Sequence, residues 1–228
     1  MGCQQDRHEA PTKPIGAQGE APKTPSKWVE LQPGLRISPG SQEVLLDAEV
    51  CLSDGWLEQV VCSVGTREHE SIMVTSVPAS ALHAGLLAVG FQPGQPGQWH
   101  WEGGTVIREA PQGSDLEILV APLGEEAWVP VRDWIMDEGG QSPQGHWVFG
   151  GSTMRDVESV PAGYSRYEAD LGGSIIGLVT FGDETVGFSE VIPDEVAMAP
   201  EEWRVRVDAV PPVGSAVHVL IRPLPNPG

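Results

Sequence analysis

Glycine and proline recur so often in this chain that long uninterrupted helices are not expected. Its 228 residues include 28 Gly and 21 Pro, which divide regular structure into short pieces. The hydrophobic content of 40% is still high enough to build a buried core. Frequent turns around a substantial core favour many short strands over long helices.

Alternation of apolar and polar residues marks the strands. Residues 43–52 alternate in this way, and a Ser-Asp-Gly turn then leads to a second apolar run at 56–61. Two such runs around a tight turn predict a β-hairpin. Further strands are expected at 35–37, 72–75, 116–121, 127–131, 146–149, 174–181, 205–207 and 216–221, with a strand continuation or one helical turn at 131–135.

One segment has helical periodicity. Leu82, Leu86 and Val89 share a face at i, i+4 and i+7, Pro78 can occupy the first turn, and Gly90 supplies a stop. The sequence therefore predicts an α+β fold: a mostly antiparallel β-sheet system with one main α-helix at about 78–90 and long Gly/Pro-rich loops.

The N-terminal residues differ in composition from the rest. Residues 4–27 hold four prolines among polar residues, with almost no bulky apolar side chain, so burial cannot offset the entropy of ordering them. We expect residues 1–27 to form a disordered tether and residues 28–228 a single globular domain.

Gly2-Cys3 resembles the junction of a bacterial lipoprotein signal, where a small residue precedes the cysteine that receives lipid. This interpretation predicts lipidation at Cys3, a membrane as partner, and a place in the cell envelope or on the periplasmic side of a bacterial membrane. Myristoylation at Gly2 fits less well, because Asp6 stands where Ser or Thr is preferred. An accidental Gly-Cys pair is the third alternative.

Net charge excludes one class of partner. The formal charge of −19 opposes the binding of nucleic acid, since contacts with phosphate groups need clustered Lys and Arg. It also disfavours anionic membrane surfaces.

Besides Cys3, the chain has two cysteines, Cys51 and Cys62. They can form a disulfide in an oxidising compartment or remain two buried thiols. In the predicted hairpin a two-residue turn would not place them opposite each other, so a direct disulfide needs a wider turn. Both alternatives stay open, and a thiol redox partner is one hypothesis for function.

The densest group of titratable side chains is the segment Arg67-Glu68-His69-Glu70-Ser71. Carboxylates that flank an imidazole suit zinc, manganese or copper, so Glu68, His69 and Glu70 are candidate ligands for a divalent metal. In an extended strand His69 would face away from both glutamates, so such a site needs a bend. The alternatives are a structural polar network and general acid–base work.

A second candidate is the cluster Trp99-His100-Trp101, which could stack a planar or sugar ligand. An apolar lid over the sheet edge is the favoured alternative. His83 is expected to be a packed helix residue that donates a hydrogen bond. Asp183 and Glu184 are interpreted as ordinary turn acids.

Several segments together resemble the YdjY-domain family of bacterial proteins. They are Val50-Cys51, Gly55, Cys62, Gly65 to Ile72, Pro78, His83-Ala84, Leu86-Leu87, Gly90, Pro93-Gly94, Asp133 to Ile135, Trp147 to Phe149, Gly151-Ser152, Tyr167, Ala169-Asp170, Pro212, Gly214 and Val217 to Leu220.

The resemblance implies an exported or lipid-anchored protein and names no reaction. Some members carry a ferredoxin-like label. However, an iron–sulfur cluster needs four Cys, or two Cys with two His, at set spacings. Cys51 and Cys62 match neither pattern, so no iron–sulfur cluster is expected.

We therefore expect an envelope-tethered binding or interaction module, with its contact surface at residues 67–71 and 99–101. The alternatives are a metal-binding protein or metal-dependent enzyme that uses Glu68-His69-Glu70, and a thiol redox partner.

Overall fold

The computed structural model describes residues 27–125, 127–156, 165–195, 198 and 202–225. Residues 1–26 of the predicted tether, Cys3 included, therefore lie outside the described residues. Within them, no helix combines the length and the apolar character needed to cross a bilayer.

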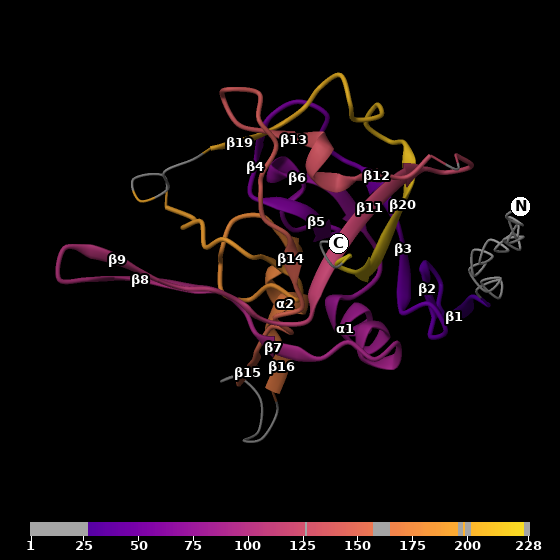
Figure 1. The fold of residues 1–228 in the computed structure, drawn as a ribbon, viewed down its shortest axis with the longest axis horizontal. Helices are drawn as coiled ribbons and strands as arrows, with labels where there is room; N and C mark the ends of the chain where they lie inside the picture. Colours follow the sequence, from indigo (N-terminus) through magenta and orange to yellow (C-terminus); the bar gives the residue numbers. More distant parts are fainter. Residues whose placement is uncertain (1–26, 126, 157–164, 196–197, 199–201, 226–228) are drawn as a thin grey trace, which may run out of the picture.

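Eleven strands form the main sheet (Figure 1). Its central path runs β17-β5-β6-β3-β20-β11-β14-β18, with β12 beside β11, and with β2 joining β1 to β3. The strands are β1 (Val29–Gln32), β2 (Leu35–Ser38), β3 (Glu43–Val50), β5 (Gln59–Ser63), β6 (Ser71–Thr75), β11 (Asp115–Pro122), β12 (Val129–Pro130), β14 (Trp147–Val148), β17 (Ser174–Gly177), β18 (Gly187–Phe188) and β20 (Ala216–Pro223).

Short ribbons and helices surround this sheet. The ribbons are β13 (Ile135–Met136) with β19 (Trp203–Val205) and β4 (Trp56–Leu57), β7 (Pro93–Gln95) with β10 (Gln112–Gly113), β8 (Gln98–Glu102) with β9 (Thr105–Glu109), and β15 (Met154–Asp156) with β16 (Ser165–Tyr167). The helices are α1 (Ala79–Ala88), α2 (Glu168–Gly172) and the 3-10 turns η1 (Glu68–Glu70) and η2 (Val131–Trp134). The chain is thus β-rich with one main helix, as the sequence predicts.

Helix α1 forms where periodicity places it. Leu82 and Leu86 are fully buried and Val89 nearly so, and α1 packs on β2 and β3. Gly90 has φ +98°, a backbone conformation that ends the helix at little cost only because the residue is glycine.

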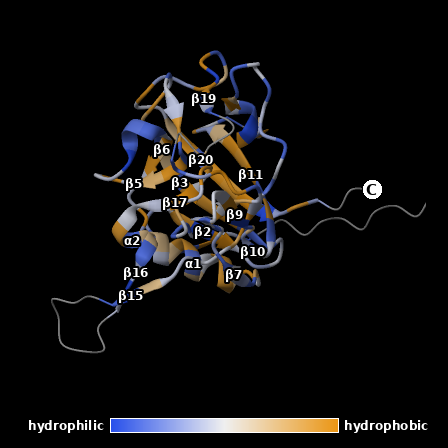
Figure 2. Ribbon diagram, turned by 90° about the vertical axis from the view of Figure 1, so that its left-hand side faces the viewer, coloured by the Kyte–Doolittle hydropathy of each residue, from blue (hydrophilic) through white to orange (hydrophobic). Residues whose placement is uncertain are grey.

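The core is continuous across neighbouring strands. Leu35, Leu46, Val219 and Val120 occupy one row of register partners on β2, β3, β20 and β11, and each is fully buried. Figure 2 shows these central strands as the most hydrophobic part of the molecule. Burial of each such side chain contributes about 2 kcal/mol.

The predicted hairpin between residues 43–52 and 56–61 is wrong. Strand β6 lies between β3 and β5, and it pairs antiparallel with β3 and parallel with β5. Strand β3 pairs with β20 along one edge and with β2 and β6 along the other. Strand β5 is almost wholly buried, and it pairs with β17 along its other edge.

The strand predicted at 174–181 ends at Gly177. Beyond it, the N–H groups of Leu178 and Val179 both donate to Glu58 O, and Thr180 N–H donates to Ile192 O. These bonds turn the chain out of the sheet and carry Phe181, Gly182 and Asp183 towards η1.

Candidate functional site

The segment from Gly65 to Ser71 contains a tight turn. Gly65 has φ +80°, and residues 68–70 form the 3-10 turn η1. The Glu68 carboxylate accepts the Gly65 N–H, and this bond lowers the pKa of Glu68. Glu68 is therefore directed back onto its own loop, whereas Glu70 faces Arg67.

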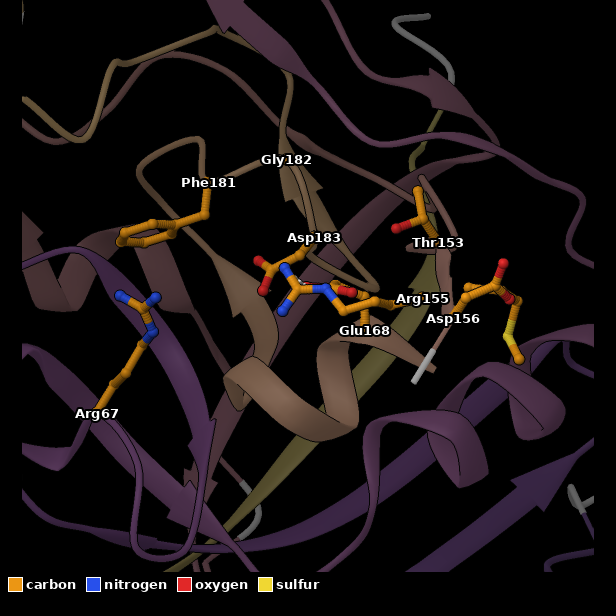
Figure 3. A pocket seen from close by; sticks show the side chains of 9 residues that line it. Arg67, Thr153, Arg155, Asp156, Glu168, Phe181, Gly182 and Asp183 are labelled. Carbon is orange, nitrogen blue, oxygen red and sulfur yellow. Dashed lines mark ion pairs between the residues drawn. The ribbon is translucent and has the colours of Figure 1, made fainter. Parts of the chain in front are cut away.

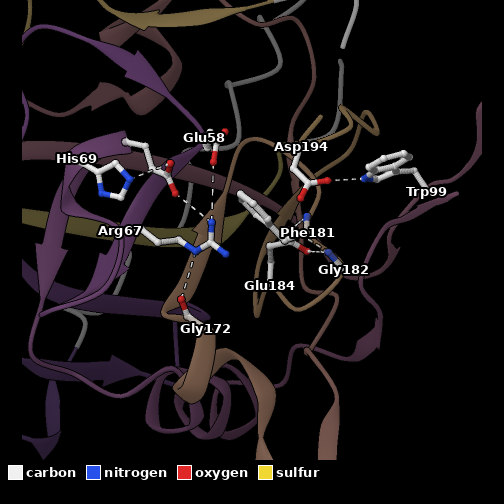
Figure 4. A network of polar contacts seen from close by, with 10 residues as sticks. Glu58, Arg67, His69, Trp99, Gly172, Phe181, Gly182, Glu184 and Asp194 are labelled. Atoms are coloured by element: carbon white, nitrogen blue, oxygen red, sulfur yellow. Dashed lines mark hydrogen bonds and ion pairs between the residues drawn. The ribbon is translucent and has the colours of Figure 1, made fainter. Parts of the chain in front are cut away.

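Arg67 is the centre of the polar contacts (Figure 4). Its Nη1 lies 3.0 Å from Glu70 Oε1 and 3.9 Å from Glu58 Oε2, and its Nε donates to Gly172 O at 3.3 Å. The guanidinium carbon stands 3.8 Å from the centroid of the Phe181 ring. Within the described parts of the chain, Nη2 has no hydrogen-bond partner.

Two carboxyl groups share this environment. Partial burial, followed by a hydrogen bond with Glu70, raises the pKa of Glu58 to about 7. The negative charge of the nearby Glu70 carboxylate disfavours ionisation of Glu58. The charge opposite Arg67 therefore changes near pH 7.

A cavity of about 600 Å³ opens beside Arg67 (Figure 3). We call it the Arg67 cavity, and its walls include Arg67, Phe181, Asp183, Thr153, Arg155 and Glu168. Within this lining, Arg155 forms an ion pair with Glu168. The lining thus brings together residues from the turn just before η1, from the loop after β17, from β15 and from α2.

Asp183 is the most constrained acid in this wall. Burial raises its pKa, and its Oδ1 has no hydrogen-bond partner among the residues described. An unpaired buried acceptor costs about 1–3 kcal/mol. Such a group usually has a partner, which can come from the protein, from water or from a ligand.

The neighbouring Glu184 holds the loop in place. It is 1% exposed and accepts the N–H groups of Phe181 and Gly182. Burial raises its pKa to about 7. Glu184 therefore fixes the backbone that places Phe181 over Arg67.

A second cavity of about 310 Å³ shares Thr153 and Met154 with the Arg67 cavity and is also lined by His83 and Tyr167. His83 Nδ1 lies 2.8 Å from Tyr167 Oη, which donates to Gly151 O at 2.9 Å. We infer that Tyr167 donates to Gly151 O and accepts from His83 Nδ1, which leaves Nε2 as an acceptor. Burial lowers the pKa of His83 and favours this neutral form. His83 is thus the packed, hydrogen-bonded helix residue that the sequence predicts.

The proposed metal ligands are only partly brought together. His69 Nε2 lies 3.4 Å from Glu70 Oε2, while Glu68 bonds to Gly65. No group of three or more His, Cys, Asp or Glu side chains suited to a metal occurs in the described ranges. The His69 side chain is 77% exposed, so it can meet a partner. The divalent-metal hypothesis stays a prediction.

Ser71 has a structural position. It is fully buried at the start of β6, and its hydroxyl has no partner among described residues. Cys51 and Cys62 are both free thiols; Cys62 is buried and Cys51 is half-buried.

The segment Trp99-His100-Trp101 lies in the β8–β9 hairpin. This ribbon forms its own two-stranded sheet and projects from the body of the molecule (Figure 1). Trp101 is 55% exposed, and Trp99 Nε1 donates to Asp194 near the base at 2.9 Å. The interpretation as a lid over the sheet edge is therefore wrong, because the hairpin extends away from the main sheet.

Sequence reasoning missed Glu58, Phe181 and Arg155 and assigned Asp183 and Glu184 only to a turn. Both acids do border a turn, but their burial depends on contacts with distant segments. The one usable signal was the presence of two adjacent acids after an apolar strand.

A family model for the YdjY domain matches residues 37–222. The chain belongs to the YdjY domain family. Neither the curated proteins nor the solved structures gave a match. Several of the segments that resemble YdjY domains, those around Arg67, His83, Gly151 and Tyr167, line the two neighbouring cavities.

Proposed function

We propose that this YdjY domain is a binding module that holds a small polar ligand in the Arg67 cavity and does not transform it. One observation carries the proposal: Arg67 is fixed by Gly172, Glu70 and Phe181, yet its Nη2 is unpaired within the described structure at the wall of a large cavity. A guanidinium fixed in this way loses little entropy when it binds an acceptor.

The lining indicates the chemistry of the ligand. Arg67 favours a carboxylate or another anionic acceptor, and Asp183 in the same wall can accept from a donor such as an ammonium, amide or hydroxyl group. A ligand that carries both kinds of group, such as an amino acid, a short peptide or an amino sugar acid, fits this pair best.

The cellular location of the protein is part of the same proposal. Lipid at Cys3, followed by the predicted tether, would hold the domain near a membrane in the cell envelope. Labelling cells with a radioactive fatty acid tests this. Label in the wild type but not in Cys3→Ser supports the anchor, and label in neither contradicts it.

A thermal-shift screen tests binding. The panel holds amino acids, dipeptides and amino sugar acids, applied to the wild type, Arg67→Gln and Arg204→Gln. Arg204 is a matched control, because its guanidinium stands 4.7 Å from the centroid of the Trp56 ring, outside the cavity. We expect a stabilising ligand for the wild type and Arg204→Gln only. An equal increase in the melting temperature of Arg67→Gln would show that Arg67 does not take part in ligand binding.

A further inference from the structure

The second cavity, which we call the His83 cavity, differs from the Arg67 cavity in charge. Its walls include Ser80, His83, Thr153, Met154 and Tyr167, and no described residue in them is a carboxylate, a lysine or an arginine. Its volume of about 310 Å³ lies at the lower end of the roughly 300–1,000 Å³ that small-molecule sites occupy. The lining therefore suits a small ligand without charge.

The start of helix α1 borders this cavity but does not favour an anion there. Ser80, in the first turn of α1, lines the cavity, and its N–H donates to Asp170 Oδ1 at 2.9 Å. The Asp170 carboxylate thus already meets the positive end of the helix dipole. A second negative charge beside it would be repelled, so a neutral ligand fits better than an anionic one.

Three contacts hold the His83 ring in one orientation. The ring packs edge-on against Phe149, with 4.9 Å between centroids, and against Tyr167, with 5.5 Å. Its Nδ1 lies 2.8 Å from Tyr167 Oη. That hydroxyl donates to Gly151 O and lies 3.1 Å from Thr185 Oγ1. The ring therefore cannot turn without the loss of the bond to Tyr167.

This orientation leaves Nε2 of His83 as an unused acceptor. The proton on Nδ1 serves Tyr167, and no hydrogen bond joins Nε2 to another residue of the described structure. His83 is only partly buried and lines the cavity, so a ligand in the cavity can reach Nε2. A hydroxyl group of such a ligand would supply the missing donor.

The backbone beside His83 is shaped for close approach. Gly151 has φ +88° and Ser152 has φ +54°. A Cβ at position 151 would stand 2.9 Å from Pro93 Cβ and 3.3 Å from His83 Cε1, so only glycine fits there without a shift. A left-handed conformation costs free energy for a serine, and such strain is common at binding sites. The two residues turn the chain so that it lines the cavity as far as Thr153.

We propose that the His83 cavity binds a neutral sugar or polyol, with one ligand hydroxyl donating to His83 Nε2. The hydroxyl groups of Ser80 and Thr153 can both donate and accept, which suits a ligand with several hydroxyl groups. Met154 and the Tyr167 ring supply apolar surface for the carbon skeleton. The site goes beyond the proposed function, because its central contact, His83, does not line the Arg67 cavity.

The test is NMR of the full chain with D-glucose, N-acetyl-D-glucosamine and myo-inositol as probes. Saturation transfer detects binding, and nitrogen-15 labelling of histidine follows the ring nitrogens. We expect at least one probe to bind and to move the Nε2 resonance of His83 towards its protonated position. Binding of none would overturn the proposal. Binding with an unchanged Nε2 resonance would overturn it too, because the sugar would then sit elsewhere, for example on Trp101. Both failures leave the Arg67 cavity untouched, since its proposed ligand is charged and these probes are neutral.

Variants of His83 give a second test. His83→Asn places its amide nitrogen as many bonds from Cα as Nδ1, so it can keep the bond to Tyr167 but has no acceptor at the position of Nε2. Its affinity for the probe should fall about 3- to 10-fold. His83→Gln, whose amide reaches the position of Nε2, should lose less, and Arg204→Gln, which lies outside the cavity, should bind like the wild type. Equal affinities of the wild type and His83→Asn would contradict the proposal, and the Nε2 resonance of the wild type decides the question even if a variant does not fold.

Discussion

The guanidinium of Arg67 packs against the ring of Phe181, with 3.8 Å between the guanidinium carbon and the ring centroid. This contact joins the η1 turn to the loop that follows β17. Arg67 also donates to Gly172 O at the end of α2. The Arg67 side chain thus connects three segments that are distant in the sequence and that meet at the Arg67 cavity.

The packing of Arg67 should be visible in stability. We expect Arg67→Lys to lower the free energy of unfolding by about 1 kcal/mol, because lysine keeps the charge but loses the planar packing and the Nε bond. Urea denaturation measures this. Arg204→Lys is the control and should change the free energy by less than about 0.5 kcal/mol, since Arg204 is 42% exposed. Equal losses in both variants would argue against a special role for Arg67.

Stability should fall as pH rises from about 4.5 to about 7. Burial raises the pKa of Glu184 from 4.5 to about 7 in the folded state, so between these values the folded protein binds more protons than the unfolded chain. Glu58 acts in the same direction, whereas His83, whose pKa is lowered, acts in the opposite one. In thermal melts from pH 5 to pH 7.5, Glu184→Gln should lose less stability than the wild type. A variant with an unchanged pH profile would show that Glu184 does not titrate there.

Anion binding in the Arg67 cavity should weaken as pH rises through about 7. Ionisation of Glu58 then adds a negative charge 3.9 Å from Arg67 Nη1, which competes with the ligand for the guanidinium. Calorimetric titrations of an anionic ligand at pH 6 and pH 8 measure this effect. In Glu58→Gln the difference between the two affinities should become smaller. An unchanged difference would assign the pH effect to another group.

The bond between His83 and Tyr167 predicts a fixed tautomer. Nitrogen NMR at pH 7 should show a proton on His83 Nδ1 and none on Nε2. Tyr167→Phe should lower the free energy of unfolding by about 1–2 kcal/mol, because Gly151 O loses its donor. A proton on Nε2 instead would mean that Tyr167 donates to His83 and not to Gly151.

The β8–β9 hairpin should contribute to contacts with partners and little to stability. Trp101→Ala should change the free energy of unfolding by less than about 0.5 kcal/mol, because the side chain is 55% exposed. Trp147 is 3% exposed, packs against Phe188 and donates to Gly177 O. Its replacement by alanine should cost about 3–5 kcal/mol. A large loss with Trp101→Ala would mean that the hairpin folds onto the body.

Local patterns predicted elements better than their pairing. Helix α1 follows from three apolar residues on one face and a terminal glycine, and β3 follows from alternation. Which strand lies beside β3 depends on edges filled by β20, β2 and β6, and no local pattern contains that information. Strand β8 was not predicted although Gln98 to Glu102 alternates polar and apolar residues, and both faces of β8 and β9 are largely exposed.

For the candidate site too, the sequence predicted local features but not the contacts between distant segments. The density of charge at residues 67–70 located one wall of the Arg67 cavity. Its partners are far away in the sequence: Gly172 lies 105 residues from Arg67, and Phe181 lies farther still. Burial then changes the chemistry of Asp183 and Glu184, which the sequence marks only as turn residues.

Ligand binding in the Arg67 cavity is tested most directly by nitrogen-15 NMR of the labelled protein during titration with the strongest stabiliser from the screen. We predict that the shifted backbone amides cluster at residues 153–156 and 181–183 around Arg67, and that Arg67→Gln abolishes these shifts. Shifts confined to the β8–β9 hairpin, with residues 181–183 unchanged, would contradict binding in this cavity.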